Sequence, residues 1–146
     1  MGRRRMVCTF FGNRDTPKEI EPILLSTLID LVENKKVDLF YVGNNGNFDY
    51  MARKSLKVLK IKYPHIRYCV VLAYMPYKKL SENEDYSDSI FPEELSGIYP
   101  RYAIVKRNNW MLDRADYVVS YVRYSYGGAW RFTEQAKKKA KMVIEL

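Results

Sequence analysis

The sequence has little of what defines several common protein classes. Only two of its 146 residues are cysteine, Cys8 and Cys69, and only one is histidine. Two isolated cysteines in apolar runs form neither a zinc pattern nor a disulfide framework, which favours reduced thiols, a cytoplasmic location and no metal site. No stretch approaches the roughly 18 consecutive apolar residues of a membrane helix, so no membrane partner is expected.

Two standard nucleotide-binding fingerprints are also missing. The chain contains no G-x-x-x-x-G-K-[ST], which argues against a P-loop NTPase. No G-x-G-x-x-G follows the first apolar run, which argues against a typical NAD-binding protein. We therefore expect no resident cofactor.

The composition that is present is basic and otherwise that of an ordinary globular domain. The chain has 25 Lys and Arg against 17 Asp and Glu, a net charge of +8, with basic residues gathered near both ends. This balance favours anionic partners such as nucleotides or nucleic acid. The length is typical of one domain, so residues 1–146 are expected to form a single domain.

Apolar runs and helical periodicity alternate along the chain. Short apolar runs predict strands, and helical spacing predicts the helices between them. The predicted strands cover 6–11, 37–42, 68–74, 117–122 and 142–146, and the predicted helices 16–34, 47–64, 102–114 and 128–141. This alternation is typical of parallel strands joined by right-handed helical crossovers. We predict an α/β fold: a Rossmann-like three-layer sandwich with a mainly parallel sheet of about five strands.

Two segments leave alternatives open. Thr16 and Glu19 match a capping box that would start the first helix, whereas Pro22 would kink its first turns or delay its start. The stretch 77–99 is polar and acidic over much of its length. We expect it to be a surface loop, with a lid over a binding site as the alternative.

Glycines follow three of the predicted strands. These turns are Gly12-Asn13-Arg14, Gly43-Asn44-Asn45-Gly46 and Gly127-Gly128. In parallel sheets, ligands bind beyond the carboxyl ends of the strands. Glycine allows a phosphate to approach the backbone closely, and the helix that follows supplies free N–H groups. We therefore predict that these turns bind a nucleotide or sugar-phosphate ligand.

Two later segments resemble motifs of the lonely-guy (LOG) phosphoribohydrolases. The stretch 107–116 is similar to their R-K-x-x-M-x-x-x-A-D motif, and 127–134 to their G-G-x-G-T-x-x-E turn. Gly12-Asn13-Arg14-Asp15 more closely resembles the YpsA-type branch of the same SMF/DprA–LOG (SLOG) superfamily. The resemblance implies a SLOG-type, Rossmann-like nucleotide-binding domain. It also makes a homodimer one expected assembly.

The LOG resemblance implies a role for particular residues. In LOG enzymes an arginine and a glutamate serve cleavage of the N-glycosidic bond of nucleoside monophosphates, which would make Arg107 and Glu134 a catalytic pair. A carboxylate can stabilise positive charge on the ribose, and an arginine can hold the phosphate. In the last turn, Ala129, Trp130 and Arg131 would contact the ligand.

Departures from the LOG pattern favour binding over hydrolysis. Asn108 replaces a lysine, Trp130 stands where a glycine is expected, and Arg131 stands at the threonine. The leading hypothesis is therefore binding of a nucleotide or nucleotide-derived phosphate ligand, as a sensor or regulator. The alternative is a nucleoside 5'-monophosphate N-glycosidase. A further alternative is a nucleic-acid-binding protein, which the basic charge and many aromatic residues permit.

Overall fold

The computed structural model describes residues 4–75 and 88–146, which form one parallel sheet flanked by helices. In this part of the chain the sheet has six strands in the order β4-β3-β2-β1-β5-β6, and every neighbouring pair is parallel. The strands are β1 (Val7–Gly12), β2 (Leu39–Val42), β3 (Arg67–Val71), β4 (Ser89–Ile90), β5 (Tyr117–Tyr121) and β6 (Met142–Glu145). The predicted α/β fold is confirmed, with six strands rather than about five.

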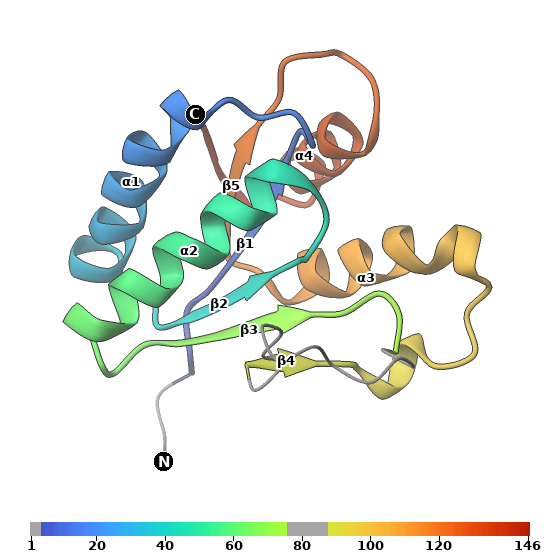
Figure 1. The fold of residues 1–146 in the computed structure, drawn as a ribbon, viewed down its shortest axis with the longest axis horizontal. Helices are drawn as coiled ribbons and strands as arrows, with labels where there is room; N and C mark the ends of the chain where they lie inside the picture. Colours follow the sequence, from blue (N-terminus) through green and yellow to red (C-terminus); the bar gives the residue numbers. More distant parts are fainter. Residues whose placement is uncertain (1–3, 76–87) are drawn as a thin grey trace.

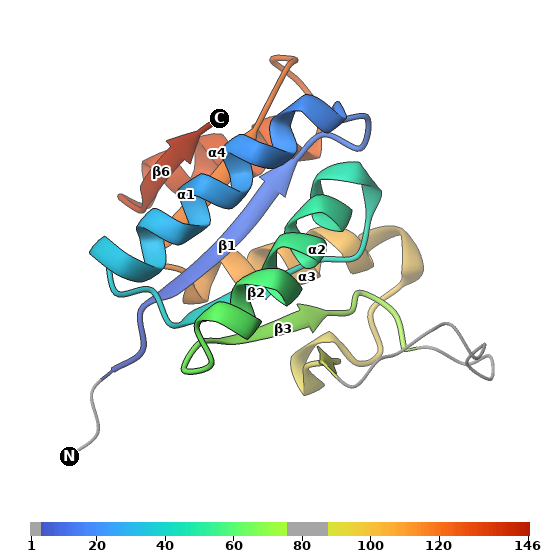
Figure 2. The same cartoon turned by 60° about the vertical axis from the view of Figure 1, so that its left-hand side comes forward.

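Helices cover both faces of the sheet (Figures 1 and 2). On one face lie α1 (Glu21–Asn34) and α2 (Gly46–Lys62), and on the other lie α3 (Pro100–Arg114) and α4 (Gly128–Lys138). The predicted three-layer sandwich is therefore confirmed. Among the described residues, no helix combines the length and the apolar character needed to cross a membrane.

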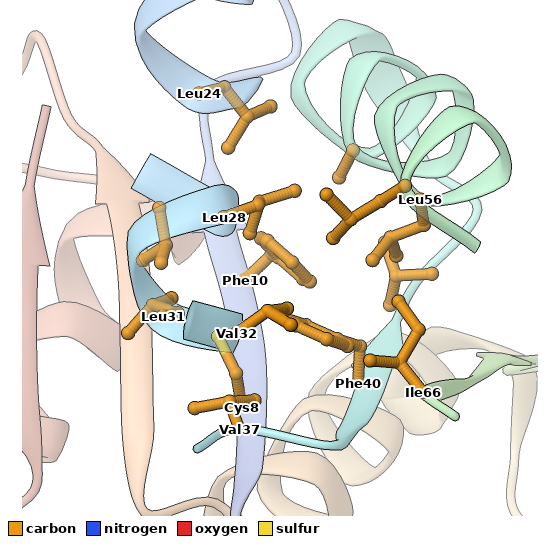
Figure 3. Close-up of a cluster of buried hydrophobic side chains, with 14 of the residues drawn as sticks. Cys8, Phe10, Leu24, Leu28, Leu31, Val32, Val37, Phe40, Leu56 and Ile66 are labelled. Carbon is orange, nitrogen blue, oxygen red and sulfur yellow. The ribbon is translucent and has the colours of Figure 1, made fainter. Parts of the chain in front are cut away.

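The core between the sheet and the pair α1 and α2 is built from large apolar side chains (Figure 3). The rings of Phe10 and Phe40, from β1 and β2, stack with their centroids 6.2 Å apart. Leu24, Leu28 and Leu31 recur at helical spacing on α1 and are fully buried, so the apolar stripe seen in the sequence is the face that packs on the sheet.

The opposite face of the sheet has its own apolar core. Phe11 follows Phe10 in β1 and points to the other side, where its ring stacks on Phe132 of α4 at a centroid distance of 5.3 Å. Met111 and Leu112 of α3 pack into the same cluster. Because β1 is covered on both faces, its sequence is a continuous apolar run instead of an alternating one.

The stretch 77–99 is only partly a loop. Residues 77–87 lie outside the described residues, but 88–99 contains β4 and a 3-10 helix, η2 (Glu93–Leu95). Strand β4 pairs with β3 through Val70 opposite Ser89 and Val71 opposite Ile90. A strand of two residues has no readable periodicity, which is why the sequence did not reveal it.

The first helix begins later than the capping-box pattern predicts. The Thr16 hydroxyl donates to the carbonyl oxygen of Asn13 at 2.5 Å and caps no helix. A 3-10 turn, η1 (Lys18–Ile20), comes first, and α1 starts at Glu21 with Pro22 in its first turn. Proline lacks an N–H and is tolerated only in the first turn, so Pro22 determines where α1 begins.

The two faces of α1 should respond differently to truncation. Leu28→Ala removes a fully buried side chain and should lower the free energy of unfolding by about 2–5 kcal/mol. Ile23→Ala on the same helix alters a side chain that is 51% exposed, and it should cost less than about 1 kcal/mol. Urea unfolding followed by circular dichroism measures both, and equal losses would contradict this account of the core.

Candidate functional site

The order in which the chain adds strands to the sheet reverses at β1, and a cleft lies at that point. Strand β1 pairs with β2 on one side and with β5 on the other, so the chain crosses from one half of the sheet to the other between them. Ligands of open parallel sheets bind outside the carboxyl ends of the strands at such a point. The cleft has a volume of about 280 Å³. The predicted site residues among those lining it are Gly12, Asn13, Arg14, Asn45, Arg107, Gly128 and Ala129.

Arg107 lies in the wall of this cleft with only 2% of its surface exposed. Its Nη1 donates to the carbonyl oxygen of Val71 at 3.1 Å and to Oδ1 of Asn44 at 3.2 Å. Its Nη2 donates to Oδ1 of Asn45 at 2.9 Å, and its Nε to Oδ1 of Asn108 at 2.9 Å. The guanidinium therefore ties α3 to the turn between β2 and α2.

Asp49 is a buried carboxylate in the same cleft, and sequence reasoning missed it as a site residue. It is 8% exposed, and its Oδ2 accepts the backbone N–H of Asn45 at 3.0 Å. Burial raises the pKa of Asp49, while the N–H of Asn45 and the charge of Arg107 oppose that rise. An acid in the first turn of a helix ordinarily faces solvent and stabilises the helix dipole. In the sequence, only the position of Asp49 directly after the Gly43–Gly46 turn indicated that it could belong to the binding site.

Three of the predicted glycines make room for the protein's own side chains. A Cβ added at Gly12 would lie 2.1 Å from Cγ of Phe48. At Gly43 it would lie 2.7 Å from Oδ2 of Asp49 and 2.9 Å from Cζ of Arg107. Gly46 has a φ of +87°, and a Cβ added there would lie 2.8 Å from Cα of Arg14. These glycines shape the wall of the cleft instead of leaving backbone open to a ligand.

The glycines before α4 are different, because their surroundings are open. A Cβ added at Gly127 or Gly128 would meet nothing within 4 Å. The first helical hydrogen bond of α4 runs from the N–H of Arg131 to the carbonyl oxygen of Gly127 at 3.0 Å, and no side chain caps the helix. The N–H groups of 128–130 are left without helical acceptors, so an anion can approach the backbone here.

Aromatic and basic side chains stand on the loop between β5 and α4. The rings of Tyr124 and Tyr126 stack at 5.4 Å, and the Arg123 guanidinium lies 5.7 Å from the centre of the Tyr124 ring. The backbone N–H of Arg123 donates to Oδ1 of Asn13 at 2.7 Å, which fixes this loop against the one that follows β1. Trp130, at the start of α4, is 38% exposed.

Glu134 is not among the residues that line the cleft. Lys137 pairs with Glu134 at 3.1 Å and with Glu145 of β6 at 3.3 Å. Arg107 thus lies in the cleft wall, whereas Glu134 forms an ion pair with Lys137 outside the cleft lining. The catalytic pairing of Arg107 with Glu134 stays a prediction. The other predicted residues that do not line the cleft are Gly43, Asn44, Gly46, Gly127, Trp130 and Arg131.

The described residues of the cleft offer hydrogen-bonding groups rather than a metal centre. Within residues 4–75 and 88–146, no group of three or more His, Cys, Asp or Glu side chains could hold a metal ion. The polar groups of the cleft are instead arginine and asparagine side chains, one carboxylate and the N–H groups at the start of α4. Such groups can hold a phosphate and hydrogen-bond a neutral partner.

A parallel sheet with helices on both faces and a cleft at the switch point defines a Rossmann-like α/β protein. No family model matches the chain, and no curated protein matches its sequence. Among solved structures it is similar to DNA processing protein A (DprA) from Streptococcus pneumoniae, with a TM-score of 0.70 and 14% identity over 97% of this chain and 50% of that one.

A second DprA structure has the same fold. DprA from Helicobacter pylori, described by its single-stranded DNA binding mode, matches with a TM-score of 0.65 and 11% identity. The match covers 96% of this chain and 64% of that one, so the chain spans half to under two thirds of these two proteins. The likeness confirms the fold that the SLOG resemblance implies, whereas membership of that superfamily and of its LOG-like or YpsA-like branch stays a prediction.

Two glycine-to-alanine changes separate crowded from open turns. Gly43→Ala should lower the free energy of unfolding by about 1–3 kcal/mol, because the new methyl group displaces Asp49 and Arg107. Gly128→Ala should be neutral or slightly stabilising, since its Cβ meets nothing and alanine favours a helix. Thermal and urea unfolding of the two variants provide the measurement, and a Gly43→Ala protein as stable as the parent would overturn the packing argument.

The raised pKa of Asp49 predicts a pH dependence of stability. Just above its ordinary pKa of 3.8, the folded protein still holds a proton that the unfolded chain has released. The contribution of Asp49 to stability therefore falls as pH rises through that interval. The difference in unfolding free energy between the parent and Asp49→Asn should fall likewise, as urea titrations at several pH values can show. A difference that stays constant with pH would contradict the shift.

Proposed function

We propose that the cleft binds a nucleotide unit of single-stranded nucleic acid. The carrying observation is that the cleft contains open N–H groups at the start of α4, while the loop that leads into that helix, outside the cleft lining, carries exposed, stacked aromatic rings. The first feature suits a phosphate and the second suits a base. The likeness to DprA supports the proposal, as does the net charge of +8.

The charges in the cleft favour one orientation of the bound unit. Asp49 would repel a phosphate, so the phosphate belongs at the other end of the cleft, near Gly128 and Ala129. Arg14 also lines the cleft and adds positive charge to it. In the described part of the chain, Oδ1 of Asp49 accepts no hydrogen bond, which leaves it able to accept an N–H or O–H from the base or sugar. Arg107, held by its four hydrogen bonds, keeps this end of the cleft in place and tempers the negative charge of Asp49.

The exposed rings supply the stacking surface. Tyr126 is 69% exposed and already lies nearly parallel to Tyr124, with an angle of 26° between their planes. A base stacked on such a ring contributes about 1–3 kcal/mol and does so with little dependence on sequence. A single strand following the carboxyl edge of the sheet would therefore gain affinity from stacking as well as from charge.

A free nucleotide is the second candidate ligand. The observation that favours it is the small volume of the cleft, about 280 Å³, which suits one small ligand better than a long chain. The chemistry of recognition is the same in both cases. Only the gain in affinity from neighbouring nucleotides distinguishes them.

Fluorescence anisotropy with labelled single-stranded DNA tests the proposal. The parent protein should bind an oligonucleotide of about twelve residues, with an affinity that falls steeply as salt rises. Arg14→Ala and Tyr124→Ala should each weaken binding roughly tenfold. Lys138→Ala is the matched control, because it removes an exposed charge at the far end of α4.

The competing outcomes are distinct in the same experiment. If a nucleoside monophosphate competes as well as the oligonucleotide does, the ligand is the free nucleotide. If neither the oligonucleotide nor the monophosphate binds, the proposed function is wrong. Equal effects of the Arg14 and Lys138 substitutions would mean attraction by net charge alone and would also overturn the proposed site.

A further inference from the structure

A second group of exposed aromatic rings lies at the start of α3, away from the stacked tyrosines of the β5–α4 loop. It consists of Tyr74 at the end of β3 together with Tyr99, Arg101 and Tyr102, and we call it the α3 shoulder. Tyr99 is 75% exposed, and Tyr74 and Tyr102 are each 47% exposed. Solvent-exposed rings in such number are unusual unless they contact a partner.

The α3 shoulder is built as a unit. The hydroxyl of Tyr74 donates to the carbonyl oxygen of Pro100 at 3.0 Å, which joins the end of β3 to the first residue of α3. The Arg101 guanidinium lies 4.8 Å from the centre of the Tyr102 ring. One face of that ring is therefore covered by a cation, a pairing that strengthens stacking of a base on the other face.

The α3 shoulder continues directly from the cleft. Ile104 and Asn108 of α3 line the cleft, and Arg101 precedes Ile104 by three residues, so all three lie on one face of the helix. Figure 1 shows the first turns of α3 extending beyond the tips of β2 and β3. A strand leaving the cleft along this face would reach Arg101 and the ring of Tyr102 that it covers.

We infer that the α3 shoulder is a second base-stacking platform, which holds nucleotides of a single strand next to the one seated in the cleft. The occupant is single-stranded nucleic acid, because the platform places exposed aromatic rings beside a cation, the combination that stacks bases and attracts the phosphate backbone. The α4 side of the cleft would hold the phosphate while the α3 shoulder extends the track. This inference rests on the proposed function and adds a direction for the strand.

Two lengths of oligonucleotide test the α3 shoulder separately from the cleft. The double variant Tyr99→Ala and Tyr102→Ala should bind an oligonucleotide of about twelve residues at least tenfold more weakly than the parent. Binding of a single nucleotide, the shorter length, should be unchanged, because one nucleotide fills the cleft alone. Tyr102→Phe should bind as the parent does, since the ring is kept.

Tyr50 provides a chemically matched control. It is a tyrosine 52% exposed on α2, on the opposite face of the sheet, with Lys54 Nζ 5.3 Å and Arg53 Cζ 5.8 Å from the centre of its ring. Tyr50→Ala should leave binding of both lengths unchanged. Circular dichroism and thermal unfolding of each variant check that the fold is intact.

The outcomes separate this inference from the proposed function. If the parent binds both lengths and the double variant binds the longer one equally well, the α3 shoulder is not a platform while the cleft proposal stands. If Tyr50→Ala weakens binding as much as the double variant does, the effect is nonspecific and the inference is wrong. If the parent binds neither length, the proposed function and this inference fail together.

Discussion

The arrangement of the cleft depends on burying the positive charge of Arg107. An isolated charge in a protein interior is very costly, so a buried guanidinium persists only where acceptors surround it. Here three asparagine side chains and the carbonyl oxygen of Val71 supply them, and Asp49 supplies the nearby negative charge. Burial lowers the pKa of Arg107 and raises that of Asp49, and the attraction between the two charges opposes both changes without cancelling them.

That requirement explains the neighbouring sequence. The turn after β2 is rich in asparagine because its side-chain oxygens face the guanidinium, and it begins with Gly43 because a methyl group there would strike both Asp49 and Arg107. Turn glycines that look alike in the sequence therefore have different structural roles. Gly43 admits side chains of the protein, whereas Gly128 leaves backbone N–H groups open toward the cleft.

The two ends of the cleft differ in electrostatic character. Its α4 end presents N–H groups without helical acceptors, and its α2 end presents the Asp49 carboxylate, next to asparagine oxygens that the Arg107 guanidinium already engages. A ligand with one anionic and one neutral part would enter in a single orientation, because reversing it would bring like charges together. Exposed rings stand on the β5–α4 loop and at the start of α3. These rings are the reason for proposing a chain of nucleotides as the ligand instead of an isolated anion.

The sequence by itself determined the layered α/β fold, since apolar runs in β1 and helical stripes such as Leu24, Leu28 and Leu31 are local signals that need no partner to be recognised. It also indicated Arg107 and the turn glycines, through their resemblance to a known motif. Only the tertiary structure decided that Asp49 faces the cleft, that Glu134 does not, and that β4 adds a sixth strand. Each of these depends on which side chains meet across long separations in the chain, and local periodicity carries no information about those contacts.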